Sequence, residues 1–265
     1  MGVGSGALEV LVESVSDPEL SIVIPCYNEE ECLPLTIPPL AATLTEAEVD
    51  YELVLVDNGS NDRTGEIIEE LAGAGLPITK GVVSRNRGLG LGFRTGFSLA
   101  RGRIVGTLCA DGQVAPGDVM RVYYALRESR RPAIAKVRRR FRSDSWIRKI
   151  VSVVYNGLMR LLFPRIKGLD VNGNPKLVHR EVLRIMDLTS NDWFLDAEIM
   201  LKAQHLNLEV IEIDVASHVR EGGTSNVRVA TVLEFFRNIV KYRLGGPWAD
   251  WRKRTRPLTA TDDLA

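Results

Sequence analysis

The feature that most constrains this chain is a regular alternation of short apolar runs with helical patterns between residues 21 and 108. The apolar runs are rich in β-branched residues, as buried strands are, and they cover 21–25, 51–56, 78–83 and 104–108. Helical patterns separate them over 29–44, 62–72 and a stretch that ends at Ala100. This alternation predicts an α/β fold in which helices flank a mostly parallel sheet.

A polar cluster follows each of the four predicted strands. These clusters occupy 26–31, 57–60, 85–92 and 111–113. In Rossmann-like sheets, ligands bind in the crevice beyond the carboxyl ends of the strands. We therefore expect four loops that are far apart in the sequence to meet at one rim and form a single ligand site.

The chain of 265 residues is within the range of one α/β domain. We expect an N-terminal tail over 1–19, the domain over 20–245, and a loose basic C-terminal tail over 246–265. Acidic and basic residues balance at 34 each, yet 127–149 contains ten Lys or Arg and two acids. This basic block predicts contact with an anionic ligand or surface, with a solvated face as the plainer alternative.

Apolar residues recur at steps of three and four after the basic block, which predicts an amphipathic helix over about 143–163. A basic block before such a helix favours an anionic membrane surface or a phosphate-bearing acceptor as its partner. No apolar run reaches the roughly 20 residues of a membrane-spanning helix. Without a secretion signal, a disulfide pattern or metal-ligand cysteine spacing, the chain is expected in the cytoplasm, peripheral at a membrane.

Two aspartates at predicted strand ends are candidates for binding a nucleotide. Asp111, followed by Gly112 and Gln113, suits a hard divalent cation at a diphosphate, and a turn cap is an equally weighted alternative. Asp57 stands where a carboxylate can accept hydrogen bonds from a base or ribose, although its neighbours are typical turn formers.

Weaker signals come from glycines and from charged residues further along the chain. The run of Gly88, Gly90 and Gly92 permits close backbone approach to a ligand, with a plain turn as the alternative. Asp196 and Glu198 are either first-turn acids of a helix or a pair that contains a general base. Arg220 beside two glycines suits a phosphate, and a solvated arginine is the alternative.

Taken in order, these segments resemble glycosyltransferase family 2, and within it the polyprenyl-phosphate sugar synthases similar to dolichyl-phosphate mannose synthase. The matching motifs span roughly residues 20–226. They are 22–30, 54–62, 86–90 with Gly96 and 100–102, 110–113 with Pro116, 170–176, 196–198, and 220–225.

The resemblance implies a GT-A fold with a C-terminal amphipathic acceptor region. It implies an inverting transfer of a hexose from GDP-mannose or a UDP-sugar to a polyprenyl phosphate, with Mg²⁺ or Mn²⁺ held by Asp111 and Gln113. Catalytic roles fall on Asp111, Asp196, Glu198 and Arg220, and acceptor contacts on Arg139 and Arg148. The nucleotide-sugar contacts that it implies are Pro25, Tyr27, Asn28, Glu29, Asp57, Gly59, Arg85, Gly88, Gly90, Gln113, Arg220 and Ser225.

Three residues depart from the pattern of this family. Cys109 and Asn58 stand where acids are usual, and Asn226 stands where a lysine is usual. These departures leave the donor, the acceptor and the use of metal open. The alternatives are a glycosyltransferase for a small soluble hydroxyl acceptor, with Asp196 or Glu198 as general base, and an inactive nucleotide-sugar binding module. No contact with nucleic acid is expected.

Overall fold

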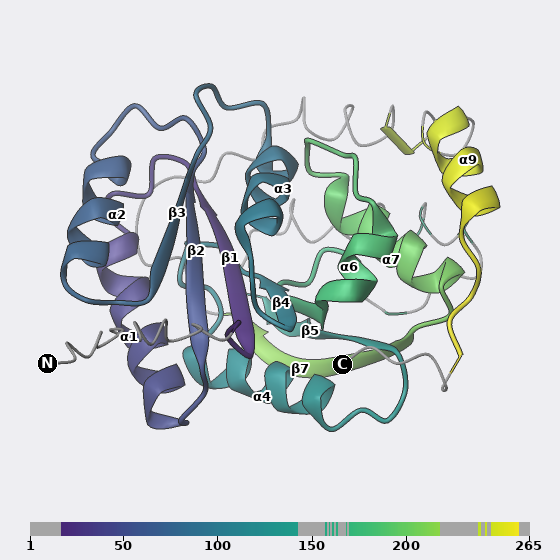
Figure 1. Cartoon of the computed structure of the whole chain (residues 1–265), viewed down its shortest axis with the longest axis horizontal. Coiled ribbons are helices and arrows are strands. Elements are labelled where there is room, and N and C mark those ends of the chain that lie inside the picture. The colour runs from purple at the N-terminus through teal and green to yellow at the C-terminus, as the bar shows by residue number, and fades with distance from the viewer. Residues whose placement is uncertain are drawn as a thin grey trace, which may run out of the picture.

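A computed structural model describes residues 17–142, 170–217 and 245–259, with single positions 157, 159, 161, 163, 168, 238, 239 and 242 between them. Its centre is a seven-stranded sheet in the order β3-β2-β1-β4-β6-β5-β7 (Figure 1). The strands are β1 (Leu20–Cys26), β2 (Tyr51–Asp57), β3 (Ile78–Val82), β4 (Ile104–Thr107), β5 (Ala133–Arg142), β6 (Lys176–His179) and β7 (Glu209–Ser217).

Helices cover both faces of this sheet, because neighbouring residues of a buried strand point to opposite sides. Ile22 and Ile24 of β1 pack in one apolar cluster with α1, α2 and α4, and Val23 packs in the other with α3, α6 and α7. The helices are α1 (Leu33–Glu46), α2 (Thr64–Gly73), α3 (Leu89–Leu99), α4 (Pro116–Arg127), α6 (Arg180–Met186), α7 (Leu195–His205) and α9 (Gly246–Arg254).

The pairing of the strands confirms the expected, mostly parallel sheet. β1 is parallel to both β2 and β4, β2 to β3, and β5 to β7, whereas β6 is antiparallel to β4 and β5. The chain runs outward from β1 to β3 and then returns to place β4 on the other side of β1. Beyond the carboxyl ends of β1 and β4 lies the switch point at which such sheets bind ligands.

The sequence analysis missed β5, which lies inside the basic block. Five of its ten residues are Lys or Arg, a composition that is unusual for an interior strand. Lys136 is nevertheless completely buried, and Arg138 and Arg139 form ion pairs with acids from other segments. The prediction of a solvated or membrane-facing block is therefore wrong for residues 133–139, because distant acids compensate their charges.

The expected loose tail from residue 246 is also wrong. Residues 246–254 form α9, and both Trp248 and Trp251 are buried. Their rings stack with centroids 5.4 Å apart, and the Trp251 indole donates to the Ile185 carbonyl at 2.9 Å. Burial of two tryptophans supplies the apolar contact that holds this helix against α7.

Most of the predicted amphipathic helix over 143–163 lies outside the described residues, as does Arg148. Among the described positions Met159 is buried and Leu161 is exposed. Within the described part of the chain, no helix combines the length and apolar character needed to cross a membrane.

A buried carboxylate joins three segments at the opposite edge of the sheet from the predicted site. Glu52 of β2 accepts hydrogen bonds from the Ser21 hydroxyl at 2.6 Å, the Arg101 backbone amide at 2.7 Å and the Thr79 hydroxyl at 2.9 Å. Burial alone would raise the pKa of Glu52, but these bonds and the Arg101 charge lower it overall. This network gives the motif at 100–102 a structural role.

Replacing Glu52 with Gln is expected to lower the free energy of unfolding by about 2 kcal/mol at neutral pH, the usual worth of hydrogen bonds to a charged group. Because the folded pKa is depressed, the stabilisation is complete above the pKa of the unfolded chain and disappears as pH falls through the folded pKa. Urea unfolding of both proteins at neutral and at strongly acidic pH measures this effect. A deficit that stays constant with pH would contradict it.

Candidate nucleotide-sugar site

The loops after β1 and β2 are joined by hydrogen bonds. The Asn28 backbone amide donates to the Ser60 hydroxyl at 3.1 Å, and the Asn28 side-chain oxygen accepts from the Asn61 amide at 2.9 Å. Asn28 has a left-handed backbone with φ of 54°, which asparagine tolerates better than most residues. Asn28 therefore links the two loops through both its backbone and its side chain. Tyr27 and Glu29, on either side of it, lie half-exposed at the same rim.

The loop after β2 also contacts the loop after β3. Asp57 accepts a hydrogen bond from the Ser60 amide at 2.9 Å, which closes a tight turn that contains Gly59. A Cβ on Gly59 would lie 2.6 Å from the Asn86 nitrogen, and the φ of Gly59 is 76°. Only glycine fits there. The structure thus brings the first three predicted loops together, with Arg85 exposed beside them.

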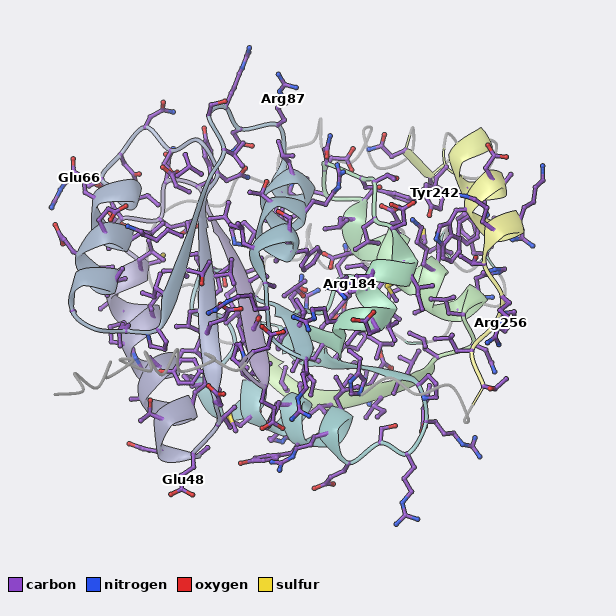
Figure 2. All side chains as sticks on the ribbon, in the orientation of Figure 1. Glu48, Glu66, Arg87, Arg184, Tyr242 and Arg256 are labelled. Atoms are coloured by element: carbon purple, nitrogen blue, oxygen red, sulfur yellow. The ribbon has the colours of Figure 1, made fainter. Side chains whose placement is uncertain are left out.

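The glycines at the start of α3 have a packing role. A Cβ on Gly90 would lie 2.6 Å from the carbonyl oxygens of Ser190 and Asp192, and one on Gly88 would lie 2.6 Å from that of Asn191. The space beside both glycines is therefore filled by the chain itself, where the sequence predicted a ligand. Arg87, directly before Gly88, projects outward (Figure 2).

The loop after β4 carries Asp111 at the switch point. The Leu108 amide bonds to the Val23 carbonyl at 3.0 Å, which ties the start of this loop to β1. Asp111 accepts a hydrogen bond from the Gln113 amide at 3.2 Å, and Gly112 between them has φ of 69°. Both polar side chains are half-exposed. The turn thus holds one carboxylate at the carboxyl edge of the sheet.

This loop suits a cation that is shared with a substrate. Among the described residues, no three His, Cys, Asp or Glu side chains gather to hold a metal ion. Burial, together with the charges of Asp111 and Asp196, raises the pKa of the Cys109 thiol. Sulfur is in any case a soft ligand, whereas Mg²⁺ and Mn²⁺ favour oxygen. Mg²⁺ commonly uses one or two carboxylates and takes its other ligands from substrate phosphates and water. Asp111 and Gln113 fit that arrangement.

The acidic pair at the start of α7 divides into two different environments. Asp196 is buried, forms an ion pair with Lys176 at 2.5 Å, and accepts from the Asn174 side chain at 3.3 Å. Asn174 in turn accepts from the Thr107 hydroxyl at 2.5 Å, at the end of β4. Asp196 is therefore held at the carboxyl edge of the sheet, near the Asp111 loop. Asn174 and Lys176 belong to one of the motifs that resemble the family, but the sequence analysis assigned no role to either residue.

Glu198, two residues further along α7, is bound by other groups of the protein. It is completely buried and forms an ion pair with Lys202 at 2.7 Å. It also accepts from the backbone amides of Ser190 at 2.8 Å and Thr189 at 3.1 Å. These contacts hold the segment that packs on Gly88 and Gly90 and give Glu198 a scaffolding role. Its catalytic role stays a prediction.

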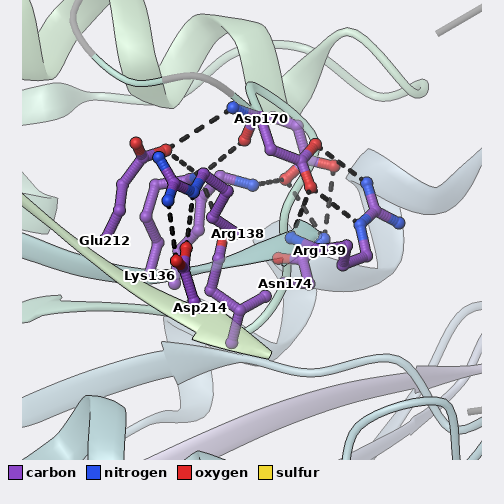
Figure 3. Close-up of polar contacts among 10 residues, drawn as sticks. Lys136, Arg138, Arg139, Asp170, Asn174, Glu212 and Asp214 are labelled. Carbon is purple, nitrogen blue, oxygen red and sulfur yellow. Dashed lines mark hydrogen bonds and ion pairs between the residues drawn. The ribbon is translucent and has the colours of Figure 1, made fainter. Parts of the chain in front are cut away.

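A buried cluster fixes the predicted acceptor residue Arg139 (Figure 3). Its guanidinium forms two hydrogen bonds to Asp170, at 2.8 and 3.0 Å. The Lys136 ammonium donates to the Asp170 carbonyl at 2.5 Å and to Glu212 at 3.1 Å. Although burial opposes it, the pairing with Asp170 raises the pKa of Arg139, so the guanidinium stays charged with Asp170 as its partner.

Lys136 is expected to make stability rise with pH in the alkaline range. Burial and the Lys176 charge lower the pKa of Lys136 from 10.5 to about 8, although Asp170 and Glu212 oppose this shift. Between these two pKa values the unfolded chain binds more protons than the folded protein does. The free energy of unfolding of the wild type should therefore rise by on the order of 2 kcal/mol as pH increases across this range. Urea unfolding across this range should show the gain in wild type and its loss in Lys136→Met. Parallel profiles of the two proteins would contradict a lowered pKa.

The remaining predicted site residues fall into two groups. Pro25 is buried near the end of β1, two residues before Tyr27. Arg148, Arg220 and Ser225 lie outside the described residues. The structure thus assembles the base and diphosphate side of the predicted site from four loops, and it adds Asn174, Lys176 and Asp170 as residues that orient its polar groups.

This fold and site define a GT-A glycosyltransferase architecture, which confirms the expected fold class. The chain resembles the crystal structure of Mycobacterium tuberculosis glucosyl-3-phosphoglycerate synthase with Mn²⁺, uridine diphosphate and glucosyl-3-phosphoglycerate, with a TM-score of 0.66 and 18% identity over 85% of this chain and 80% of that one. The crystal structure of a mycobacterial protein gives a TM-score of 0.67 and 21% identity, over 85% and 74%.

The chain belongs to glycosyl transferase family 2, whose sequence model matches residues 21–185. It is 33% identical over 208 residues to the undecaprenyl-phosphate 4-deoxy-4-formamido-L-arabinose transferase of Proteus mirabilis, covering 78% of this chain and 62% of that protein. The protein of the same name from Edwardsiella ictaluri is 34% identical over 222 residues, covering 83% and 66%. The chain thus spans less than two thirds of the length of these relatives.

Proposed function

We propose that this chain is an inverting glycosyltransferase that moves a hexose from a nucleoside-diphosphate sugar, GDP-mannose or a UDP-sugar, to a polyprenyl phosphate. The observation that carries the proposal is that the joined loops after β1 and β2 and the Asp111 loop after β4 follow neighbouring parallel strands at the switch point of the sheet. Family membership and the undecaprenyl phosphate in the names of the relatives support it.

Each part of the site has a role in this reaction. Asp57 and the rim around Asn28 bind the base and ribose, and Asp111 with Gln113 lies at the diphosphate. A bound Mg²⁺ or Mn²⁺ ion would neutralise the diphosphate as it leaves. An oxygen of the acceptor attacks the anomeric carbon from the side opposite the diphosphate, so one C–O bond forms as the other breaks and the configuration inverts.

The contacts of Asp196 favour an acceptor that is already an anion. Its carboxylate accepts from the Lys176 ammonium and the Asn174 amide, so those lone pairs are occupied. A phosphate needs no general base, whereas a hydroxyl acceptor requires one. The hydroxyl-acceptor alternative depends on Asp196, because Glu198 is enclosed by its own partners.

A double variant, Asp196→Asn with Lys176→Met, separates these two acceptor classes without leaving a buried charge unpaired. We expect transfer to a prenyl phosphate to fall by less than about tenfold. If Asp196 is a general base, turnover should fall by roughly 10²–10⁴, the usual contribution of such a group. Single-turnover rates at saturating donor measure the effect, and unchanged donor affinity is the control.

The donor can be identified by thermal shift with a panel of nucleotide sugars, with and without Mn²⁺, because a ligand of the folded state raises its stability. The stabilising donor is then incubated with prenyl phosphates and with hydroxyl acceptors, and the products are analysed by mass spectrometry. A glycosyl prenyl phosphate supports the proposal. Products on hydroxyl acceptors alone, or no transfer at all, would contradict it.

We also place the chain at the cytoplasmic surface of a membrane. The support is the basic part of the chain over 140–149 and the lipid acceptor named for the relatives. Co-sedimentation with anionic liposomes tests this placement, with Arg148→Ala expected to weaken binding. Wild-type protein that stays in the supernatant would contradict it.

A further inference from the structure

The loop after β3, residues 84–88, lies against the part of the rim that contains Asp57. In the sheet, β2 is placed between β1 and β3, so the loop after β2 has the loop after β3 as its neighbour on one side (Figure 1). The contact is close, because a Cβ on Gly59 would lie 2.6 Å from the Asn86 nitrogen and 3.1 Å from the Arg85 Cα. A base bound at Asp57 would therefore meet residues 84–88 as its outer wall.

A buried amide holds this wall in place. Asn58, directly after Asp57, is 2% exposed, and its Nδ2 donates to the Gly88 carbonyl at 3.1 Å. Among the described residues, Asn58 is the side chain outside the loop that bonds to the backbone of 84–88. Within the loop, the Asn86 side-chain oxygen accepts from the Gly88 amide at 2.8 Å. Gly88 is thus fixed through both its carbonyl and its amide.

The Asn58 side chain is itself enclosed by two elements of the fold. Its backbone amide donates to the Cys26 carbonyl at 2.8 Å, which ties the residue to the end of β1. A Cβ on Gly92 of α3 would lie 3.2 Å from the Asn58 Cγ and 2.7 Å from the Pro25 Cβ, so α3 packs directly against the amide. Because β1 and α3 confine it, the amide N–H has one direction, and the Gly88 carbonyl is held there.

The fold uses only half of this amide, which favours a functional role. The Asn58 Oδ1 atom is buried and has no hydrogen-bond partner among the described residues. Such an atom costs free energy, and an apolar side chain of similar shape would avoid that cost. An ionised acid, which is usual at this position in the family, has no N–H to offer a carbonyl. What the amide supplies at this position is therefore the bond to Gly88.

We propose that Asn58 is a positioning residue that determines which base the donor site accepts. By fixing Gly88 it sets the place of Arg85 and Asn86, and with them the hydrogen-bonding groups that a base at Asp57 meets. Bases differ in their donors and acceptors, so a wall held in one place rejects the wrong base, whereas a loose wall adapts to it. The inference rests on the proposed transfer from a nucleotide sugar and assigns the selection of its base.

The test measures the affinities of uridine, guanosine, cytidine and adenosine diphosphate by isothermal titration calorimetry, with Mg²⁺ present. The wild type should bind one of the four at least about tenfold more tightly than the weakest. In Asn58→Leu this ratio should fall by about fivefold or more, roughly the worth of one hydrogen bond. The melting temperature of the free variant should stay at the wild-type value or rise, because the unpaired oxygen is removed.

Asn86→Ala is a second variant, because it releases the Gly88 amide from a half-exposed position at which truncation is tolerated. It should lose the same discrimination, and it decides the matter if Asn58→Leu does not fold. Asn191→Ala is the matched control. Asn191 lies against Gly88 through its backbone carbonyl, which the variant keeps, and its side chain bonds to Arg94. This control should discriminate among the bases as the wild type does.

The outcomes separate this inference from the proposed function. The role of Asn58 is wrong if the wild type binds all four nucleotides alike, if folded Asn58→Leu keeps the wild-type ratio, if all four affinities fall by the same factor, or if Asn191→Ala loses as much. A wild type that binds none of the four would refute the nucleotide-sugar donor and the proposed function with it. Transfer to a prenyl phosphate without any base preference would sustain the reaction and refute only the role of Asn58.

Discussion

Replacing Asp111 with Asn is expected to lower kcat/KM for sugar transfer by a factor of roughly 10²–10³, the usual loss when one charge-stabilising group at a reacting centre is removed. Within the part of the chain that the structure describes, no cluster of three metal-ligating side chains could bind the cation in place of Asp111. The variant should also lose the additional thermal stabilisation that Mn²⁺ gives in the presence of the nucleotide. Rates and melting temperatures, measured with and without Mn²⁺, check both effects.

Asp118→Asn is the control for this experiment. Asp118 lies in the first turn of α4, soon after the Asp111 loop, and pairs with Arg121 at 2.8 Å. It carries the same charge but belongs to a surface ion pair, which contributes little. We expect the Asp118→Asn variant to transfer sugar at the wild-type rate and to be stabilised by Mn²⁺ as the wild type is. An Asp111→Asn protein that keeps full activity would remove the diphosphate role of this loop and, with it, the basis of the proposed function.

Replacing Glu198 with Gln is expected to lower the free energy of unfolding by about 3–5 kcal/mol, because it leaves Lys202 buried without its ionic partner. Lys202 also donates to the Asp187 carbonyl at 2.8 Å and lies over the Trp251 ring at 4.9 Å. Loss of the pair should therefore loosen the contact between α7 and α9. Urea unfolding followed by tryptophan fluorescence measures the change.

The double variant Glu198→Gln with Lys202→Met should recover most of the lost stability, since no charge is then left unpaired. This pattern distinguishes a scaffolding residue from a general base. A general base would instead give a stable Glu198→Gln protein whose turnover falls by roughly 10²–10⁴. That second result would contradict the role that the contacts of Glu198 give it.

Several features of the fold and site could be read from the sequence because they depend on neighbours along the chain. The alternation of apolar runs and helical patterns specifies β1 to β4 and their mostly parallel pairing. Turn-forming residues such as Gly59 and Gly112 mark the loops after two of these strands. Since parallel strands end at one edge, the shared position of Asp57 and Asp111 followed from the same pattern.

Other features depend on partners that are distant in the sequence, and only the tertiary structure decided them. β5 resembled a solvated basic segment until Asp170 and Glu212 were seen to neutralise it. Asp196 and Glu198 are two residues apart, yet the helical rotation between them sends one toward Lys176 and the other toward Ser190. The sequence by itself determined the first strands, their loops and the family. Tertiary contacts decided which charges are structural, because a buried charge is tolerated only where a distant segment brings its partner.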